Sequence, residues 1–215
     1  MTGSSSDAGD APKRPGLRHV FANLAHLLSG KAAAGVISLI YLVVVARDLG
    51  SAGYGVLVLV HGYVTLIGGV VAFSGFHGVV RYGALALEAG NHPRMVRILR
   101  FMALLELACG VVAVLVAAAL APLVGPRLGW PPEAVRFAGP YSLAVLATVR
   151  ATPQGVCQLA GRFDLIGLQQ VVPPLVRLIG ALVVLAIDGG LLGFLVAWLI
   201  SALVETITMW AFGFL

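Results

Sequence analysis

Long apolar stretches separated by short polar segments constrain this chain more than any other feature of its sequence. Six of them can be drawn, over Leu24–Ala46, Gly55–Val80, Leu99–Leu123, Val135–Leu159, Leu165–Ile187 and Leu191–Phe214. Each has roughly the 20 residues that a helix needs to cross a membrane. A chain inside lipid must satisfy its own backbone hydrogen bonds, which a helix does internally. The sequence therefore predicts an all-α integral membrane protein with about six transmembrane helices.

The composition agrees with a protein that lies mostly in lipid. Hydrophobic residues make up 60% of the 215 residues and charged residues 11%, with a mean hydropathy of +0.99, whereas about a quarter of a soluble domain is charged. The basic residues behind the net charge of +5 lie between the apolar stretches. They report orientation in a membrane, so a nucleic-acid-binding protein is excluded. Arg94, Arg97 and Arg100 form a basic face suited to the anionic headgroups of membrane lipids.

The distribution of these basic residues predicts which ends of the spans face the cytoplasm. With the N-terminus inside, the inner segments hold nine Lys and Arg residues and the outer segments hold three. The positive-inside rule then places the N-terminus in the cytoplasm, and six spans return the C-terminus to the same side. We expect a multi-pass protein of the inner, cytoplasmic membrane, with residues 1–16 as a disordered tail and 17–215 as one six-helix unit.

Two arginines fall near the middle of predicted spans, where arginine is costly. A central arginine costs roughly 2.5–3.5 kcal/mol on insertion scales. Arg150 and Arg177 are therefore expected to face water or a partner rather than lipid. The alternative is that Arg150 snorkels to the interface, but about nine residues separate it from the inner end of its span.

Polar neighbours extend the two arginines into a hydrated wall. Gln154 follows Arg150 by four residues, and Gln169, Pro173 and Arg177 recur every four residues, so the last three share one helical face. Pro173 and Pro174 remove two backbone donors in mid-span. Irregular backbone at that depth is tolerated where protein or a water-filled cavity satisfies it, although a simple proline kink is the alternative.

Three further charged residues are candidates for the same cavity or for pairing within it. A glycine-containing break, Ser74–Gly78, would turn Arg81 toward the inner mouth of a cavity, unless Arg81 is an ordinary arginine at a helix end. Glu106 and Glu205 are the acids within spans. They are predicted either to pair with Arg177 and Arg150 or to carry protons.

Other chemistries find no support in the sequence. His61 and His77 lack neighbours at ligand spacing and are interpreted as packing histidines, so no metal site is predicted. Cys109 and Cys157 lie inside spans and show no metal-ligand spacing either. No phosphate-cradling loop of the G-x-x-x-x-G-K-[ST] kind occurs, and no cofactor is expected.

Two segments resemble a known family of transporters. Ala46-Arg47-Asp48-Leu49-Gly50-Ser51-Ala52-Gly53-Tyr54-Gly55 is similar to the Ala-Arg-x-Leu-Gly-x-x-x-Tyr-Gly pattern of the polysaccharide transporters, the lipid-linked oligosaccharide flippases of the MATE-like superfamily. Gly161-Arg162-Phe163-Asp164-Leu165, followed by Leu175-Val176-Arg177, is similar to their fourth-to-fifth helix region. The resemblance covers about Leu17 to Phe214.

The resemblance implies two lobes of helices that alternate access to a central cationic cavity, with a polyprenyl-diphosphate-linked oligosaccharide as cargo. This chain has the spans of the N-terminal lobe only, so the second lobe is absent. A truncated gene, an incomplete sequence and a half-sized protein that dimerises are the three explanations. The expected partners are the lipid-linked glycan, membrane lipids and either a second copy or a separate second lobe.

Four functions remain open at this point. In the first, the protein is a flippase lobe and not an enzyme, and the cavity residues Arg150, Arg177, Arg81, Gln154 and Gln169 bind the substrate. The second is the lobe of a drug or cation exporter of the same superfamily, for which acids should dominate the cavity. The third is a membrane-bound glycosyltransferase or polymerase, which would need acid–base groups outside the bilayer. The fourth is a structural membrane protein that transports nothing.

Overall fold

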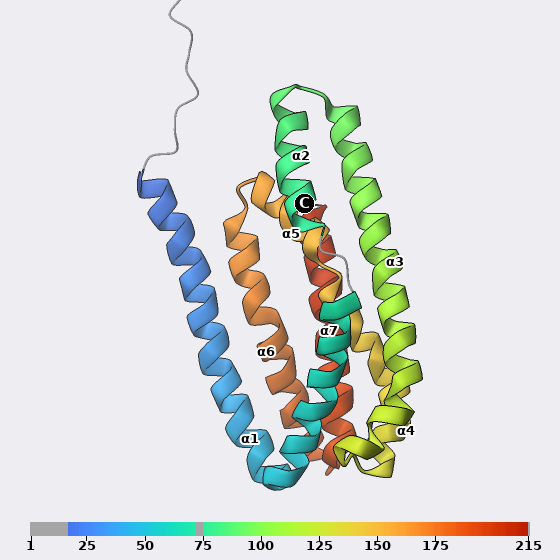
Figure 1. The fold of residues 1–215 in the computed structure, drawn as a ribbon. Helices are drawn as coiled ribbons and strands as arrows, with labels where there is room; N and C mark the ends of the chain where they lie inside the picture. Colours follow the sequence, from blue (N-terminus) through green and yellow to red (C-terminus); the bar gives the residue numbers. More distant parts are fainter. Residues whose placement is uncertain (1–16, 72–74, 215) are drawn as a thin grey trace, which may run out of the picture.

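The computed structural model describes residues 17–71 and 75–214, and over these residues the chain is helical with no strand. The helices run along one common axis, and the two ends of the described chain lie toward the same end of the bundle (Figure 1). The all-α prediction is confirmed for this part of the chain. The predicted tail, residues 1–16, and Ser74 of the predicted glycine break lie outside the described residues.

The first helix, α1 (Leu17–Val71), reverses direction at a glycine. Gly50 has φ 67° and ψ 176°, a combination that is essentially restricted to glycine because a Cβ would clash there. The two arms of α1, residues 17–49 and 51–71, therefore run in opposite directions (Figure 1). They correspond to the first predicted span and to most of the second, with the turn inside the segment that resembles the transporter family.

Two helices complete the first half of the bundle. α2 (Phe76–Glu88) begins after Gly75, and α3 (His92–Val124) crosses the bundle in the opposite direction (Figure 1). The Asn91 side-chain oxygen accepts a hydrogen bond from the Arg94 N–H at 3.0 Å, which caps the first turn of α3. The Asn-His-Pro sequence thus ends the α2–α3 turn and begins α3.

The fourth predicted span, Val135–Leu159, is not one continuous helix. After the short η1 (Pro126–Leu128), the chain forms α4 (Pro132–Tyr141), η2 (Ser142–Thr148) and α5 (Ala151–Leu159). Pro140 lacks an N–H and ends the regular part, and Arg150 has φ −145° and ψ 1°, outside the helical region. The prediction of a single helix here was wrong because the sequence hydropathy does not register this break.

The last two helices form a hairpin at the centre of the bundle. α6 (Phe163–Ala186) contains Pro173 and Pro174 without interruption, so the predicted irregular backbone is absent there. The hydroxyl of Ser201 on α7 (Gly190–Gly213) donates to the Pro173 carbonyl at 3.0 Å. This contact joins the proline turn of α6 to its neighbour.

Within the described part of the chain, four helical segments are long and apolar enough to cross a membrane: Leu28–Val71, His92–Val124, Phe163–Ala186 and Gly190–Gly213. This number is lower than six for two structural reasons. The segment Leu28–Val71 contains two antiparallel arms that meet at Gly50, so it covers two predicted spans. The fourth predicted span is divided into pieces that are individually too short. The number of six crossings stays a prediction.

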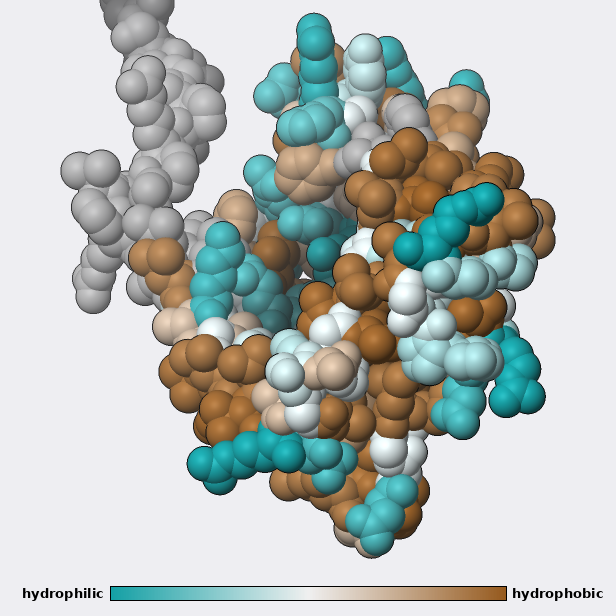
Figure 2. Space-filling model, turned by 60° about the horizontal axis from the view of Figure 1, so that its bottom comes forward, coloured by the Kyte–Doolittle hydropathy of each residue, from teal (hydrophilic) through white to brown (hydrophobic). Residues whose placement is uncertain are grey.

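Apolar side chains cover the outside of the bundle as well as its interior. Tyr141, Phe194 and Leu57 are among the largest fully buried side chains, whereas Leu66 and Leu104 are about two-thirds exposed. The space-filling view shows hydrophobic surfaces around a recess in which hydrophilic residues gather (Figure 2). An apolar exterior of this extent suits lipid as the surrounding solvent.

The orientation predicted from the basic residues can be tested at the two ends of the bundle. The turn of α1 and the α3–α4 connection lie at one end, and the α2–α3 connection lies at the other (Figure 1). In a variant without Cys109 and Cys157, cysteines at Ser51 and Leu128 should react with an impermeant thiol reagent added to sealed cells. A cysteine at His92, which spares the Asn91 cap, should stay unlabelled. Labelling at His92 would reverse the orientation.

Candidate functional site

A cavity of about 650 Å³ lies between the two arms of α1, the η2 segment and the helices α5, α6 and α7. It brings together four of the five predicted substrate-binding residues and one of the two predicted acids: Arg150, Arg177, Gln154, Gln169 and Glu205. All four binding residues come from the two polar segments found in the sequence analysis, Arg150 with Gln154 and Gln169 with Arg177. Thr148, Pro173 and Pro174 lie beside them. The local spacing of these residues therefore places them on one wall.

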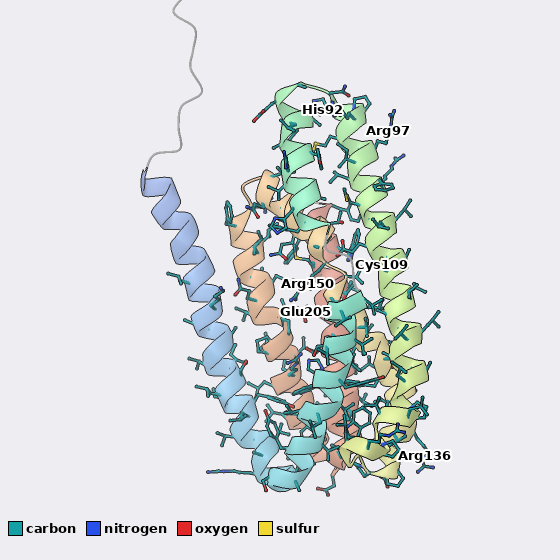
Figure 3. The ribbon with its side chains drawn as sticks, in the orientation of Figure 1. His92, Arg97, Cys109, Arg136, Arg150 and Glu205 are labelled. Atoms are coloured by element: carbon teal, nitrogen blue, oxygen red, sulfur yellow. The ribbon has the colours of Figure 1, made fainter. Side chains whose placement is uncertain are left out.

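Arg150 and Glu205 form an ion pair inside this cavity. The two labelled side chains point toward one another in the middle of the bundle (Figure 3). The Glu205 side chain is 11% exposed and that of Arg150 44% exposed, so the pair is open to the cavity on the arginine side. The Gln169 amide also donates to the Glu205 backbone carbonyl at 2.7 Å. The charge of Arg150 is thus balanced by an acid from α7.

Arg177 has a different environment, because no acid lies within ion-pair distance of it in the described residues. Its guanidinium carbon lies 4.6 Å from the centre of the Trp198 ring, which attracts the cation through the electrons of the ring face. Its Nε is buried and has no hydrogen-bond partner in the part of the chain that is described. Arg177 therefore presents an uncompensated positive charge to the cavity.

An aromatic cluster holds Arg177 in this position. Trp198 donates its indole N–H to the hydroxyl of Tyr41, and the His61 ring meets the Trp198 ring edge-on at 4.5 Å. His61 Nδ1 lies 2.8 Å from the Tyr141 hydroxyl, and His61 Nε2 lies 3.5 Å from a terminal nitrogen of Arg177. The cluster joins α1, α4, α6 and α7 around one guanidinium group.

Sequence analysis missed this cluster and interpreted His61 as a packing histidine. Its members come from four separate helices, so no local spacing links them. One general signal was available, since an ionisable residue within a membrane span is a candidate functional residue by default. His61 lines the cavity and satisfies that criterion.

A second cavity of about 460 Å³ lies beside the first and shares three lining residues with it: Ser38, Pro174 and Arg177. It also contacts Tyr54, from the segment that resembles the transporter family. Arg177 borders both cavities, so a bound group could contact it from either side.

Two predicted site residues lie elsewhere. Arg81 on α2 is exposed and does not line the cavity; its guanidinium carbon lies 5.9 Å from the centre of the Tyr82 ring. Glu106 is buried and pairs with no arginine among the described residues. Its carboxylate oxygens accept hydrogen bonds from the backbone N–H groups of Ala151 at 2.6 Å and Thr152 at 2.8 Å.

Glu106 thus satisfies the backbone where the fourth predicted span is broken. The first N–H groups of a helix have no partner within that helix, and they would be costly to leave bare at this depth. A carboxylate suits the positive end of the α5 dipole. The predicted pairing of Glu106 with an arginine was wrong because its partner is the backbone of a broken helix.

The chain is similar in sequence to a known inner membrane protein. The inner membrane protein YghQ of Escherichia coli (strain K12) is 31% identical to it over 173 residues. These residues are 80% of this chain and 49% of YghQ, so the chain spans about half the length of this relative. No protein-family model matches the chain, and no solved structure matches it significantly. This chain is a multi-pass inner membrane protein.

Proposed function

We propose that this inner membrane protein is one lobe of a flippase that moves a polyprenyl-diphosphate-linked oligosaccharide across the membrane by alternating access. The observation that carries the proposal is the uncompensated charge of Arg177 in a cavity with a polar lining. A cation held in a medium of low dielectric constant attracts an anion much more strongly than it would in water. The cavity is therefore suited to an anionic cargo.

The chemistry of the cavity supports a diphosphate that carries a sugar. A guanidinium group binds phosphate oxygens through two parallel N–H donors. Gln154, Gln169 and Thr148 offer amide and hydroxyl groups to sugar hydroxyls, while the apolar outer surface suits a polyprenyl tail. Transport of this kind makes and breaks no bond, so we propose that the protein is not an enzyme.

The same cavity fits a cation exporter less well. Such a protein needs an unpaired acid to attract its cargo. Glu205 is the acid among the described lining residues, and it is engaged by Arg150. The acids Asp48, Glu133 and Asp188 line neither cavity, so among the described residues no acid–base pair for a glycosyltransferase lies beside the bound group.

We propose that a second lobe completes the cavity. If these 215 residues are the whole product, that lobe comes from a second copy of this chain or from a separate protein. The polar wall would be costly against lipid. Two lobes related by an axis along the membrane normal face the same way across the bilayer, as parallel repeats do. The matched residues are 49% of YghQ, so the rest of that relative is long enough to form a second lobe.

A binding experiment on the purified chain in lipid nanodiscs tests the class of cargo. The probe is citronellyl-diphosphate-glucose, a water-soluble diphosphate diester, and the competitor is the lipophilic cation tetraphenylphosphonium. We expect saturable binding of the radiolabelled probe that excess unlabelled probe displaces and tetraphenylphosphonium does not. Binding of tetraphenylphosphonium alone would favour an exporter. Binding of neither compound would contradict the proposed function.

A further inference from the structure

The contacts of His61 match those of a neutral ring while the cavity is empty. A guanidinium nitrogen can only donate a hydrogen bond, so His61 Nε2, at 3.5 Å from Arg177, must accept. His61 Nδ1 then carries the ring proton and donates to the Tyr141 hydroxyl at 2.8 Å. A histidine that donates through one nitrogen and accepts through the other is neutral.

Protonation of His61 would disrupt this arrangement. The imidazolium ring has two donors and no acceptor, so the contact with Arg177 would become a contact between two donors. It would also place two positive charges side by side in a cavity of low dielectric constant, which disfavours the charged form of the histidine. The empty cavity thus holds one positive charge at this point rather than two.

A bound diphosphate would reverse this preference. An anion at Arg177 neutralises the guanidinium charge and offers oxygen acceptors beside His61 Nε2, which lines the same cavity. A protonated His61 could then donate to the anion together with Arg177. We propose that His61 takes up a proton when a diphosphate binds at Arg177, an inference that rests on the proposed function.

The charges around His61 indicate that a dianionic diphosphate would need a second cation beside Arg177. The charged and titratable groups that contact the ring or share its cavity are Arg177, Tyr141, Lys31, Arg150 and Glu205, with Tyr41 behind Trp198. Arg150 and Glu205 cancel one another, and Lys31 is an exposed residue of the α1 arm. A diphosphate diester is dianionic, so Arg177 alone leaves one negative charge unbalanced. An imidazolium at His61 supplies the missing charge at contact distance.

If anion binding and proton uptake by His61 are coupled, the affinity for the probe depends on pH. When binding takes up one proton, affinity rises as pH falls, by at most about tenfold for each pH unit. The probe citronellyl-diphosphate-glucose keeps a constant charge near neutral pH, so the protein is the source of any dependence. We expect it to bind about tenfold or more tightly at pH 6 than at pH 8. In His61→Gln, which keeps an acceptor for Arg177 but cannot titrate, the affinity should hardly change with pH.

Calorimetry of the unmodified chain provides a second measurement that does not depend on a variant folding. Binding enthalpies measured at pH 7 in buffers with different ionisation enthalpies report the protons exchanged with the buffer. We expect uptake of up to about one proton for each probe bound. His77→Gln, a change at an exposed histidine on α2, should leave both results unchanged.

The outcomes separate this inference from the function on which it rests. If the probe binds and Arg177→Gln abolishes binding, but the pH profile is flat and no proton is taken up, the role of His61 is wrong and the anion site stands. If the pH dependence survives in folded His61→Gln, another group takes up the proton and the inference fails. If the probe does not bind at any pH, both the function and the inference fail.

Discussion

Replacing Arg177 by alanine is expected to lower the affinity for citronellyl-diphosphate-glucose by about 30-fold to several thousand-fold, because removing one partner of a buried charge pair typically costs roughly 2–5 kcal/mol. Arg177→Lys should recover part of the loss, since an ammonium group keeps the charge but lacks the planar pair of donors. The measurements are probe binding in nanodiscs and translocation of a fluorescent lipid-linked sugar in vesicles that contain the chain.

Arg150 provides a matched comparison, because its charge is compensated by Glu205. Arg150→Ala should also weaken binding, but partly by leaving Glu205 as an unpaired acid that repels the anion. The double variant Arg150→Ala/Glu205→Ala removes that repulsion and should bind the probe more tightly than Arg150→Ala alone. Arg177 has no such acid partner in the described residues, so no second change should rescue Arg177→Ala.

The result that would contradict this scheme is equally specific. Normal binding and translocation in both Arg177→Ala and Arg150→Ala would return the two arginines to a structural role. An equal loss in the two single variants, without rescue by Glu205→Ala, would show that the ion pair seen in the empty cavity does not persist when the cargo is bound.

Local periodicity was sufficient to predict one wall of the cavity. Gln169, Pro173 and Arg177 repeat at four residues on one helix, so their shared face follows from helical geometry alone. The cost of arginine at membrane depth then indicated that this face is hydrated. Both inferences depend on neighbours within one or two turns, where sequence spacing and spatial distance agree.

The environment of Arg177 could not be predicted in the same way. Trp198, His61 and Tyr141 lie 21, 116 and 36 residues away along the chain, and only the packing of four helices brings them together. The hydrogen-bond partner of Glu106 could not be predicted for the same reason. The partner is the backbone of Ala151 and Thr152, which follow Glu106 by 45 and 46 residues. A backbone group carries no residue identity, so no pattern of side chains reveals it.

The broken helix also explains why apolar length overestimated the number of continuous spans. Hydropathy treats Val135–Leu159 as uniform, yet Pro140, the η2 segment and Arg150 divide it into short elements. Such a break is tolerated in a membrane only if other residues form hydrogen bonds with the freed backbone groups. On α3, Glu106 meets that condition for the start of α5.

Replacing Glu106 by alanine is therefore expected to destabilise the fold by about 2–6 kcal/mol, because a buried N–H group and a part-buried one each lose an acceptor at roughly 1–3 kcal/mol. Stability can be measured by SDS titration of the purified protein in mixed micelles. Leu107→Ala is the matched control on the same helix, since Leu107 is 48% exposed and its truncation faces lipid. Glu106→Gln should be intermediate, because its amide retains one oxygen acceptor for the two donors.

Gly110, one turn along α3 from Glu106, gives this prediction a second test. A Cβ at Gly110 would lie 2.4 Å from the Cγ2 of Val149, which shows how closely α3 approaches the break. Gly110→Ala should push α3 away, lengthen the hydrogen bonds to Glu106 and destabilise the fold in the same direction. Because both changes act through one contact, their effects should be less than additive in the double variant. Additive effects, or a Glu106→Ala variant as stable as Leu107→Ala, would mean that water or another group satisfies the start of α5.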